Sequence, residues 1–205
     1  MDWVKAIREE AKTRSVLRTN ELALKYKIGQ PSVTQALARL ERKELVERVN
    51  DKTYYNWLAL DASPRDLVNV LRTDAYISLE SALREYGIST QSPRTITCVT
   101  TERPGDFNSR SIRISYRGIS PRLYWGFLRK QTLYGSYLIA EPEKAILDWI
   151  YLGLRNGVPP ALDELDFANV SRTKLLEYAR RFSSSTFQYI LPTLAENLSF
   201  AAAGS

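Results

Sequence analysis

Apolar and polar positions alternate along the first 60 residues with a period that changes from helical to extended. Asp2 can cap a first helix, whose apolar side recurs at helical spacing through Trp3, Ala6, Ile7 and Ala11. A short extended piece over 15–19 follows. Thr19 or Asn20 can cap a second helix, which turns Leu22 and Tyr26 inward. This pattern predicts two helices separated by a short strand.

The next segment predicts the most clearly two-sided helix of the chain. Pro31 suits its first turn. One arc of the helical wheel is apolar and holds Val33, Ala36, Leu37 and Leu40, whereas the opposite side holds Gln35, Ala38, Arg39 and Arg42, flanked by Ser32 and Thr34. The turn before the helix, 27–30, has the length of a helix-turn-helix connection, and its Gly29 is free to take a positive φ.

Two strands, over 44–49 and 53–58, follow that helix and are joined by the hairpin turn 50–52. The left-handed conformations that Asn50 and Asp51 tolerate favour this turn. Helix, strand, helix, tight turn, helix and hairpin within 60 residues predict a winged helix-turn-helix domain over 1–60.

The rest of the chain predicts a second domain over 75–200, joined by a linker and connecting helix over 61–74. A helix over 76–88, capped by Ser78 and ended by Gly87, precedes candidate strands over 94–101, 110–118, 122–128 and 131–140. Helices follow over 141–157, 171–182 and 185–198, the last kinked at Pro192. The fold class is therefore α+β, with a small, mainly antiparallel sheet and C-terminal helices. The tail 201–205 resembles a cloning scar and is excluded.

Composition narrows the chemistry. Histidine is absent and Cys98 is the single cysteine, which removes the usual zinc ligands, the commonest general base and any internal disulfide. We therefore expect no enzyme, no metal and no cofactor. The sequence has neither a signal peptide nor a stretch of roughly 20 apolar residues, so we expect a cytoplasmic bacterial or archaeal protein without membrane contact.

Charge favours a polyanionic partner for the first domain. The formal net charge is +6, and residues 1–60 hold 12 Lys/Arg against 8 Asp/Glu, whereas the other 145 residues hold 17 against 15. The second helix of a helix-turn-helix pair enters the major groove, where glutamine reads adenine and arginine reads guanine. The candidate DNA-binding residues are Gln30, Ser32, Thr34, Gln35, Arg39 and Arg42 on this helix, with Arg48 and Lys52 on the hairpin.

The second domain resembles a known family in three segments: "AYISLESALREYGI" at 75–88, the strand "TITCVTT", and "LIAEPEKAILDWIYL" at 138–152. These are similar to the AbiEi family, the antitoxins and transcriptional regulators of type IV (abortive-infection) toxin–antitoxin pairs. The resemblance implies a repressor that binds inverted repeats in its own operator, associates with the nucleoid when bound, and counters a nucleotidyltransferase-like toxin without a stable complex. It also singles out the "EPEK" motif, with Glu141, Glu143, Lys144 and Asp148.

Read from the residues alone, that motif has two interpretations. Glu141 and Glu143 suit the positive end of a helix, and Lys144 can pair with Asp148 one turn later. Alternatively, the four residues line a functional surface. Strand cations form a second candidate basic face: Arg110, Arg113, Arg117, Arg122, Arg129 and Lys130. Two rival functions stay open, a winged-helix protein-interaction or ligand-sensing module and a metal-dependent nuclease.

Overall fold

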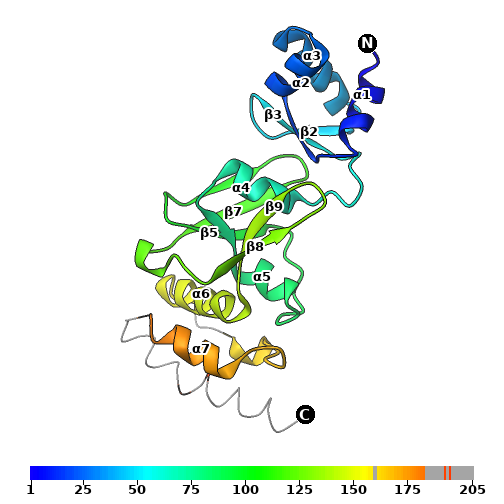
Figure 1. Cartoon of the computed structure of the whole chain (residues 1–205). Helices are drawn as coiled ribbons and strands as arrows, with labels where there is room; N and C mark the ends of the chain where they lie inside the picture. The colour runs from blue at the N-terminus through cyan, green and yellow to red at the C-terminus, as the bar shows by residue number, and fades with distance from the viewer. Residues whose placement is uncertain (159–160, 183–191, 193, 195–205) are drawn as a thin grey trace. The chain divides into compact units, whose positions relative to one another are not determined.

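A computed structural model describes residues 1–158, 161–182, 192 and 194 of the chain (Figure 1). The fold is mixed α/β, with seven α-helices and two sheets in the described part, and strand pairing is mainly antiparallel. Two compact units are present. The first contains Met1–Thr73 with the short segments Phe107–Arg113 and Lys130–Tyr137, and the second contains Asp74–Asp106, Ile114–Arg129 and the chain from Leu138 onward.

The first unit begins with six elements in the order that the pattern predicted. They are α1 (Trp3–Glu10), β1 (Val16–Arg18), α2 (Thr19–Tyr26), α3 (Gln30–Glu41), β2 (Val46–Arg48) and β3 (Thr53–Asn56). The strands form a three-stranded antiparallel sheet in the order β1-β3-β2, in which β3 pairs with both neighbours. A 3-10 turn (Pro64–Leu67) and the short helix α4 (Val68–Leu71) follow, inside the predicted linker.

The core of the first unit lies under the apolar sides of its helices. Its fully or almost fully buried members come from three helices and all three strands: Ile7, Leu17, Leu22, Val33, Leu37, Leu40, Val46 and Tyr54. The helical residues among them were predicted to face inward. Burying each such side chain contributes roughly 1.5–3 kcal/mol, so the amphipathic spacing of the sequence is what draws these elements together.

Three local predictions for the first unit were wrong. Gly29 has φ −58°, and the left-handed residue of the turn is Lys27, which ends α2 with φ 53°. The second helix begins at Thr19 itself, because the side chain of Thr19 is buried and Arg18 occupies the N-cap position. The hairpin turn needs no left-handed residue at Asn50 or Asp51, since the side chain of Asn50 accepts a hydrogen bond from the backbone of Lys52.

The larger sheet contains six strands in the order β6-β7-β5-β4-β9-β8. Their bounds are β4 (Ala75–Ile77), β5 (Ile96–Thr100), β6 (Gly105–Asn108), β7 (Arg113–Gly118), β8 (Phe127–Gln131) and β9 (Ser136–Ala140). The central strand β4 pairs antiparallel with β5 and parallel with β9, and β5 pairs parallel with β7. With six strands the sheet is larger than predicted, and it includes two parallel pairings, although strand pairing in the described part of the chain is mainly antiparallel, as predicted.

In the described part of the second unit the helices are α5 (Leu79–Glu85), α6 (Pro142–Arg155) and α7 (Arg172–Ala179), together with 3-10 turns at Pro121–Leu123 and Leu162–Glu164. Helix α6 packs against both α5 and α7, and α5 packs on β5 (Figure 1). Among the described residues, every helix is too short or too polar to cross a bilayer. The predicted helix over 185–198, with its kink at Pro192, and the tail 201–205 lie outside the described residues.

Strand boundaries in the second unit differ from prediction where backbone turns intervene. The first residues of the predicted helix over 76–88 belong to β4. A strand of three residues is too short for its side-chain alternation to be recognised in the sequence. The predicted strand over 122–128 is a 3-10 turn and a bend, and extended structure starts only at Phe127. The bend needs Gly126, whose φ is +73° and whose missing Cβ leaves room for the side chain of Lys144. Residues 131–140 form a hairpin turn and β9, and β6 was not predicted.

A buried carboxylate ties α1 to α2 in the first unit. Glu10 is fully buried, and one of its oxygens accepts hydrogen bonds from the Tyr26 hydroxyl and the Lys25 ammonium, each at 2.6 Å. The other oxygen accepts from the guanidinium of Arg14. Burial raises the pKa of Glu10, but these hydrogen bonds outweigh burial and hold the pKa below its ordinary value of 4.5.

Glu10→Gln should therefore lower the free energy of unfolding at pH 7 by about 1–3 kcal/mol, because a charge-assisted cluster is lost. A carboxyl with a lowered pKa stabilises the native state above its ordinary pKa, and this contribution disappears as the pH falls through the lowered value. The difference between wild type and variant should thus shrink as the pH is lowered below 4.5, as measured by urea denaturation followed by circular dichroism. Glu9→Gln, which alters an exposed pair with Lys12, is the matched control and should show no such trend.

Candidate functional site

The outward side of α3 is the first candidate site, and its geometry follows from how the helix is seated. Val33, Ala36, Leu37 and Leu40 are buried, which fixes the rotation of the helix about its axis. The side chains on the remaining circumference are therefore presented to solvent. Ser32, Gln35, Arg39 and Arg42 are all exposed and fall within one arc of the wheel. At 1.5 Å per residue this row is about 15 Å long.

Three of the predicted contact residues are already engaged by the protein. The side-chain amide of Gln30 donates to the Thr19 hydroxyl at 3.0 Å, and the Thr34 hydroxyl donates to the backbone carbonyl of Gln30 at 3.1 Å. The guanidinium of Arg48 is paired with Asp51 at 2.6 Å within the hairpin. These residues can shape the helix N-terminus and the hairpin tip, but their polar groups are less free than the sequence suggested.

The other five predicted residues carry side chains without a hydrogen bond or ion pair to any part of the chain that the structure describes: Ser32, Gln35, Arg39, Arg42 and Lys52. Lys43, next to Arg42, is exposed in the same way and was not singled out by sequence reasoning. The nearest acidic group, Glu41, accepts a hydrogen bond from the backbone N–H of Arg48. An exposed row of unpaired donors, two of them guanidinium groups, can bind phosphate or base edges.

The second candidate basic face is not continuous. Arg113 and Arg117 are exposed on β7, whereas Arg129 and Lys130 are exposed on β8. Three strands separate β7 from β8 in the sheet, which corresponds to four strand spacings, roughly 19 Å. Arg110 is paired with Glu44, and Arg122 follows Pro121 in a 3-10 turn. Alternating cations in the sequence thus give separate patches, because strands adjacent along the chain are not adjacent in this sheet.

The "EPEK" motif divides into a partly buried carboxylate (Glu141), a buried carboxylate (Glu143) and a buried ion pair. Glu141 precedes α6 and accepts hydrogen bonds from the Lys174 ammonium at 2.7 Å and the Tyr178 hydroxyl at 2.6 Å. Burial raises the pKa of Glu141, but these donors outweigh burial and lower it. Glu143 is buried and accepts from the backbone N–H of Ser171 at 3.0 Å. The two glutamates therefore anchor α7 to the first turn of α6.

Lys144 and Asp148 are both completely buried and form an ion pair one turn apart in α6. The Lys144 ammonium also donates to the Tyr76 hydroxyl at 2.9 Å, and Tyr76 donates in turn to Asp148 at 2.9 Å. The Ser78 hydroxyl donates to the same carboxylate oxygen at 2.9 Å. This buried ionic cluster, defined as Lys144, Asp148, Tyr76 and Ser78, joins α6 to β4 and the residue after it. Since Lys144 and Asp148 do not reach solvent, they cannot line a surface, and the structural interpretation of this pair is the one that fits.

Burial dominates the electrostatics of the cluster. It lowers the pKa of Lys144 and raises the pKa of Asp148, although each charge partly offsets the effect on the other. Aromatic rings enclose the ammonium, with the Trp125, Tyr76 and Phe182 centroids 5.2, 5.3 and 5.4 Å away. Tyr124 and Phe127, which are partly buried, pack on Tyr76.

Ser78 extends this cluster to the start of α5. Its backbone N–H donates to the carbonyl of Thr97 at 3.0 Å, and the Thr97 hydroxyl donates back to the carbonyl of Ser78 at 2.8 Å. The Ser81 backbone N–H donates to the Thr97 hydroxyl at 3.0 Å. The Ser78 side chain therefore does not cap α5, contrary to the prediction, because it is committed to Asp148. The i, i+4 spacing of Lys144 and Asp148 predicts that they can form a pair. Nothing in the sequence around Tyr76 and Ser78 indicates that these two residues contact that pair.

Within the described residues, no group of three or more histidine, cysteine, aspartate or glutamate side chains is placed to hold a metal ion. Cys98 is buried, and burial raises the pKa of its thiol. Compared with models of known protein families and with curated protein sequences, the chain matches none.

Asp148→Ala should lower the free energy of unfolding by about 3–5 kcal/mol, because it leaves the Lys144 charge buried without a partner. The double variant Lys144→Met, Asp148→Leu should regain a large part of that loss, since both charges are removed together. Recovery stays partial because Tyr76 and Ser78 lose their acceptor. Guanidinium denaturation of the three proteins measures the coupling, and a loss under about 1 kcal/mol for Asp148→Ala would contradict the assignment of a buried pair.

Proposed function

We propose that the chain is a sequence-specific, DNA-binding transcriptional autoregulator, and that residues 1–60 form a winged helix-turn-helix domain. The observation that carries the proposal is the exposed, partner-free row Ser32, Gln35, Arg39 and Arg42 on α3, opposite a side that is fully committed to the core. The tight turn after α2 and the hairpin after α3 support the same domain type.

In this proposal α3 lies in the major groove and its row reads base edges and phosphates. A length of about 15 Å suits a groove roughly 12 Å wide. Gln35 and Arg39 are the candidates for two-point contacts with bases, and Arg42 and Ser32 for phosphates. The exposed Lys52 at the hairpin tip adds a contact to the backbone or the minor groove. Gln30, Thr34 and Arg48 act by holding the helix N-terminus and the hairpin in shape.

We further propose that the protein is the antitoxin of a type IV toxin–antitoxin pair, like the AbiEi family that segments 75–88 and 138–152 resemble. The operator would then be an inverted repeat in the promoter of its own operon. The toxin would be nucleotidyltransferase-like and be countered without a stable complex. The test is co-expression of a neighbouring nucleotidyltransferase-like gene with and without this chain. Restored growth supports the antitoxin role, whereas growth arrest in both cultures contradicts it.

Arg39→Ala should weaken binding to the selected operator by about 1–3 kcal/mol, because a two-point contact with a base is lost, and should weaken binding to random duplex DNA much less. Operator sequence comes from footprinting on the protein's own promoter, and affinity from fluorescence anisotropy at several salt concentrations. Log affinity should fall steeply with log salt, by about 0.9 for each phosphate contact.

The matched control is Arg8→Ala, which removes the same charge from an exposed position on α1 of the same unit. It should leave both affinities nearly unchanged. Equal losses on operator and random DNA for Arg39→Ala would assign this residue to the phosphate backbone. Undiminished operator binding by a combined Gln35→Ala, Arg39→Ala variant would refute α3 as the reading helix.

A further inference from the structure

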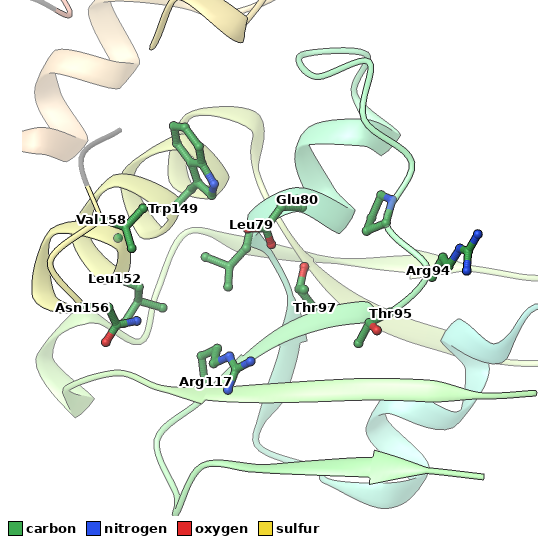
Figure 2. A pocket seen from close by; sticks show the side chains of 12 residues that line it. Leu79, Glu80, Arg94, Thr95, Thr97, Arg117, Trp149, Leu152, Asn156 and Val158 are labelled. Carbon is green, nitrogen blue, oxygen red and sulfur yellow. The ribbon is translucent and has the colours of Figure 1, made fainter. Parts of the chain in front are cut away.

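A cavity of about 430 Å³ opens in the second unit and belongs to none of the sites described above. Helices α5 and α6, the approach to β5, and β7 all contribute to its lining (Figure 2). The residues that decide its chemistry are Leu79, Trp149 and Leu152 on the apolar side and Arg94, Arg117 and Asn156 on the polar side. Its volume lies in the range of pockets that bind small organic molecules.

Two arginines contribute to the polar side of the cavity, but only Arg117 lies beside the space itself, because the side chain of Arg94 points away from it (Figure 2). Arg117 stands on β7 beside Val99 of the parallel strand β5, and Arg94 lies two residues before β5 begins. The nearest carboxylate to Arg117 is that of Asp106, at 4.0 Å, and both side chains are about half exposed, which makes the pair weak. Arg94 has no ion pair within the part of the chain that the structure describes. Glu80 is the single acidic residue of the lining, so the cavity has a net positive charge.

The opposite side offers a flat apolar surface. Trp149 of α6 is partly exposed, with its indole beside the cavity, and Leu79 and Leu152 lie between the indole and Arg117 (Figure 2). An indole ring next to two aliphatic side chains suits stacking of a planar, weakly polar group. The guanidinium group of Arg117 suits a carboxylate or a phosphate, which it can bind through two parallel hydrogen bonds. Apolar and cationic surfaces thus face one space.

The wall between these surfaces is held rigidly. Leu79 has φ +57°. Among the described residues other than glycine, it is the one that is buried and has a positive φ. A leucine in this conformation costs on the order of 1–3 kcal/mol and persists only where neighbouring groups enforce it. Ser78 and Thr97 supply this constraint, through their reciprocal hydrogen bonds and the bond from Ser78 to Asp148. The buried ionic cluster therefore fixes one side of the cavity.

We propose that this cavity is a binding site for a small organic anion with a flat ring, its acidic group on Arg117 and its ring against Trp149. This site is independent of DNA binding by α3 and adds a ligand to the protein. Two sources share the required chemistry, a nucleoside monophosphate and an aromatic carboxylate. In both compounds the planar ring would pack against apolar side chains, and only the acidic group differs.

Isothermal titration calorimetry of the full chain with four nucleoside monophosphates and with indole-3-acetate distinguishes the two sources. At least one probe should bind saturably with a 1:1 stoichiometry. Arg117→Ala should weaken this binding about tenfold or more, because a charge-assisted contact is lost. Trp149→Leu should weaken binding of the anionic probe and also of indole, which has the ring but no acidic group. Arg117→Ala should leave the binding of indole unchanged.

The matched control is Arg113→Ala, which removes the same charge from an exposed position on the same strand, outside the cavity lining. Its affinity should match that of the wild type. Absence of saturable binding for every probe at millimolar concentration overturns the proposal. So does an equal loss of affinity in Arg113→Ala and Arg117→Ala, because that result would mean attraction by net charge alone. Circular dichroism of each variant verifies that the fold is retained.

Discussion

A pair of opposite charges sealed inside the second unit constrains most of what surrounds it. Lys144 and Asp148 lose several kcal/mol of hydration each on burial, so the unit must supply other partners for them. Tyr76 and Ser78 do so from β4 and the residue after it, which fixes α6 against the centre of the sheet. The glycine at 126 then becomes obligatory, because a Cβ there would crowd the lysine side chain.

The same constraint reaches the start of α5. Ser78 bonds Asp148 with its side chain and Thr97 with its backbone, so it cannot cap the helix that follows it. Leu79 accordingly begins α5 with a positive φ, and the resulting wall borders the cavity beside Trp149. A buried polar contact thus has a consequence at the surface, a preorganised recess whose shape depends on groups that no ligand could touch.

Arginine serves the two proposed sites in physically different ways. On α3 the guanidinium groups of Arg39 and Arg42 project from an exposed helix, where solvent and salt screen them, and their effect on a polyanion comes from number and spacing. Arg117 instead borders a cavity next to apolar side chains, where a single anion loses much of its water and a planar fork can hold it in one orientation. The first arrangement suits a long charged duplex and the second a small molecule.

Sequence by itself determined the elements of the first unit and the side of each helix that is buried, because hydrophobic spacing is a local property. On α3 the apolar side that contains Leu37 faces the core, and the opposite side, which contains Arg39, is therefore exposed. It also placed Lys144 one turn from Asp148. Tertiary structure alone decided that this pair is buried, that Tyr76 and Ser78 complete it, that β7 and β8 lie far apart in the sheet, and that Arg117 and Trp149 border the same cavity. Those facts depend on the order in which strands pair and on contacts between residues some 70 positions apart, and no period in the chain encodes either.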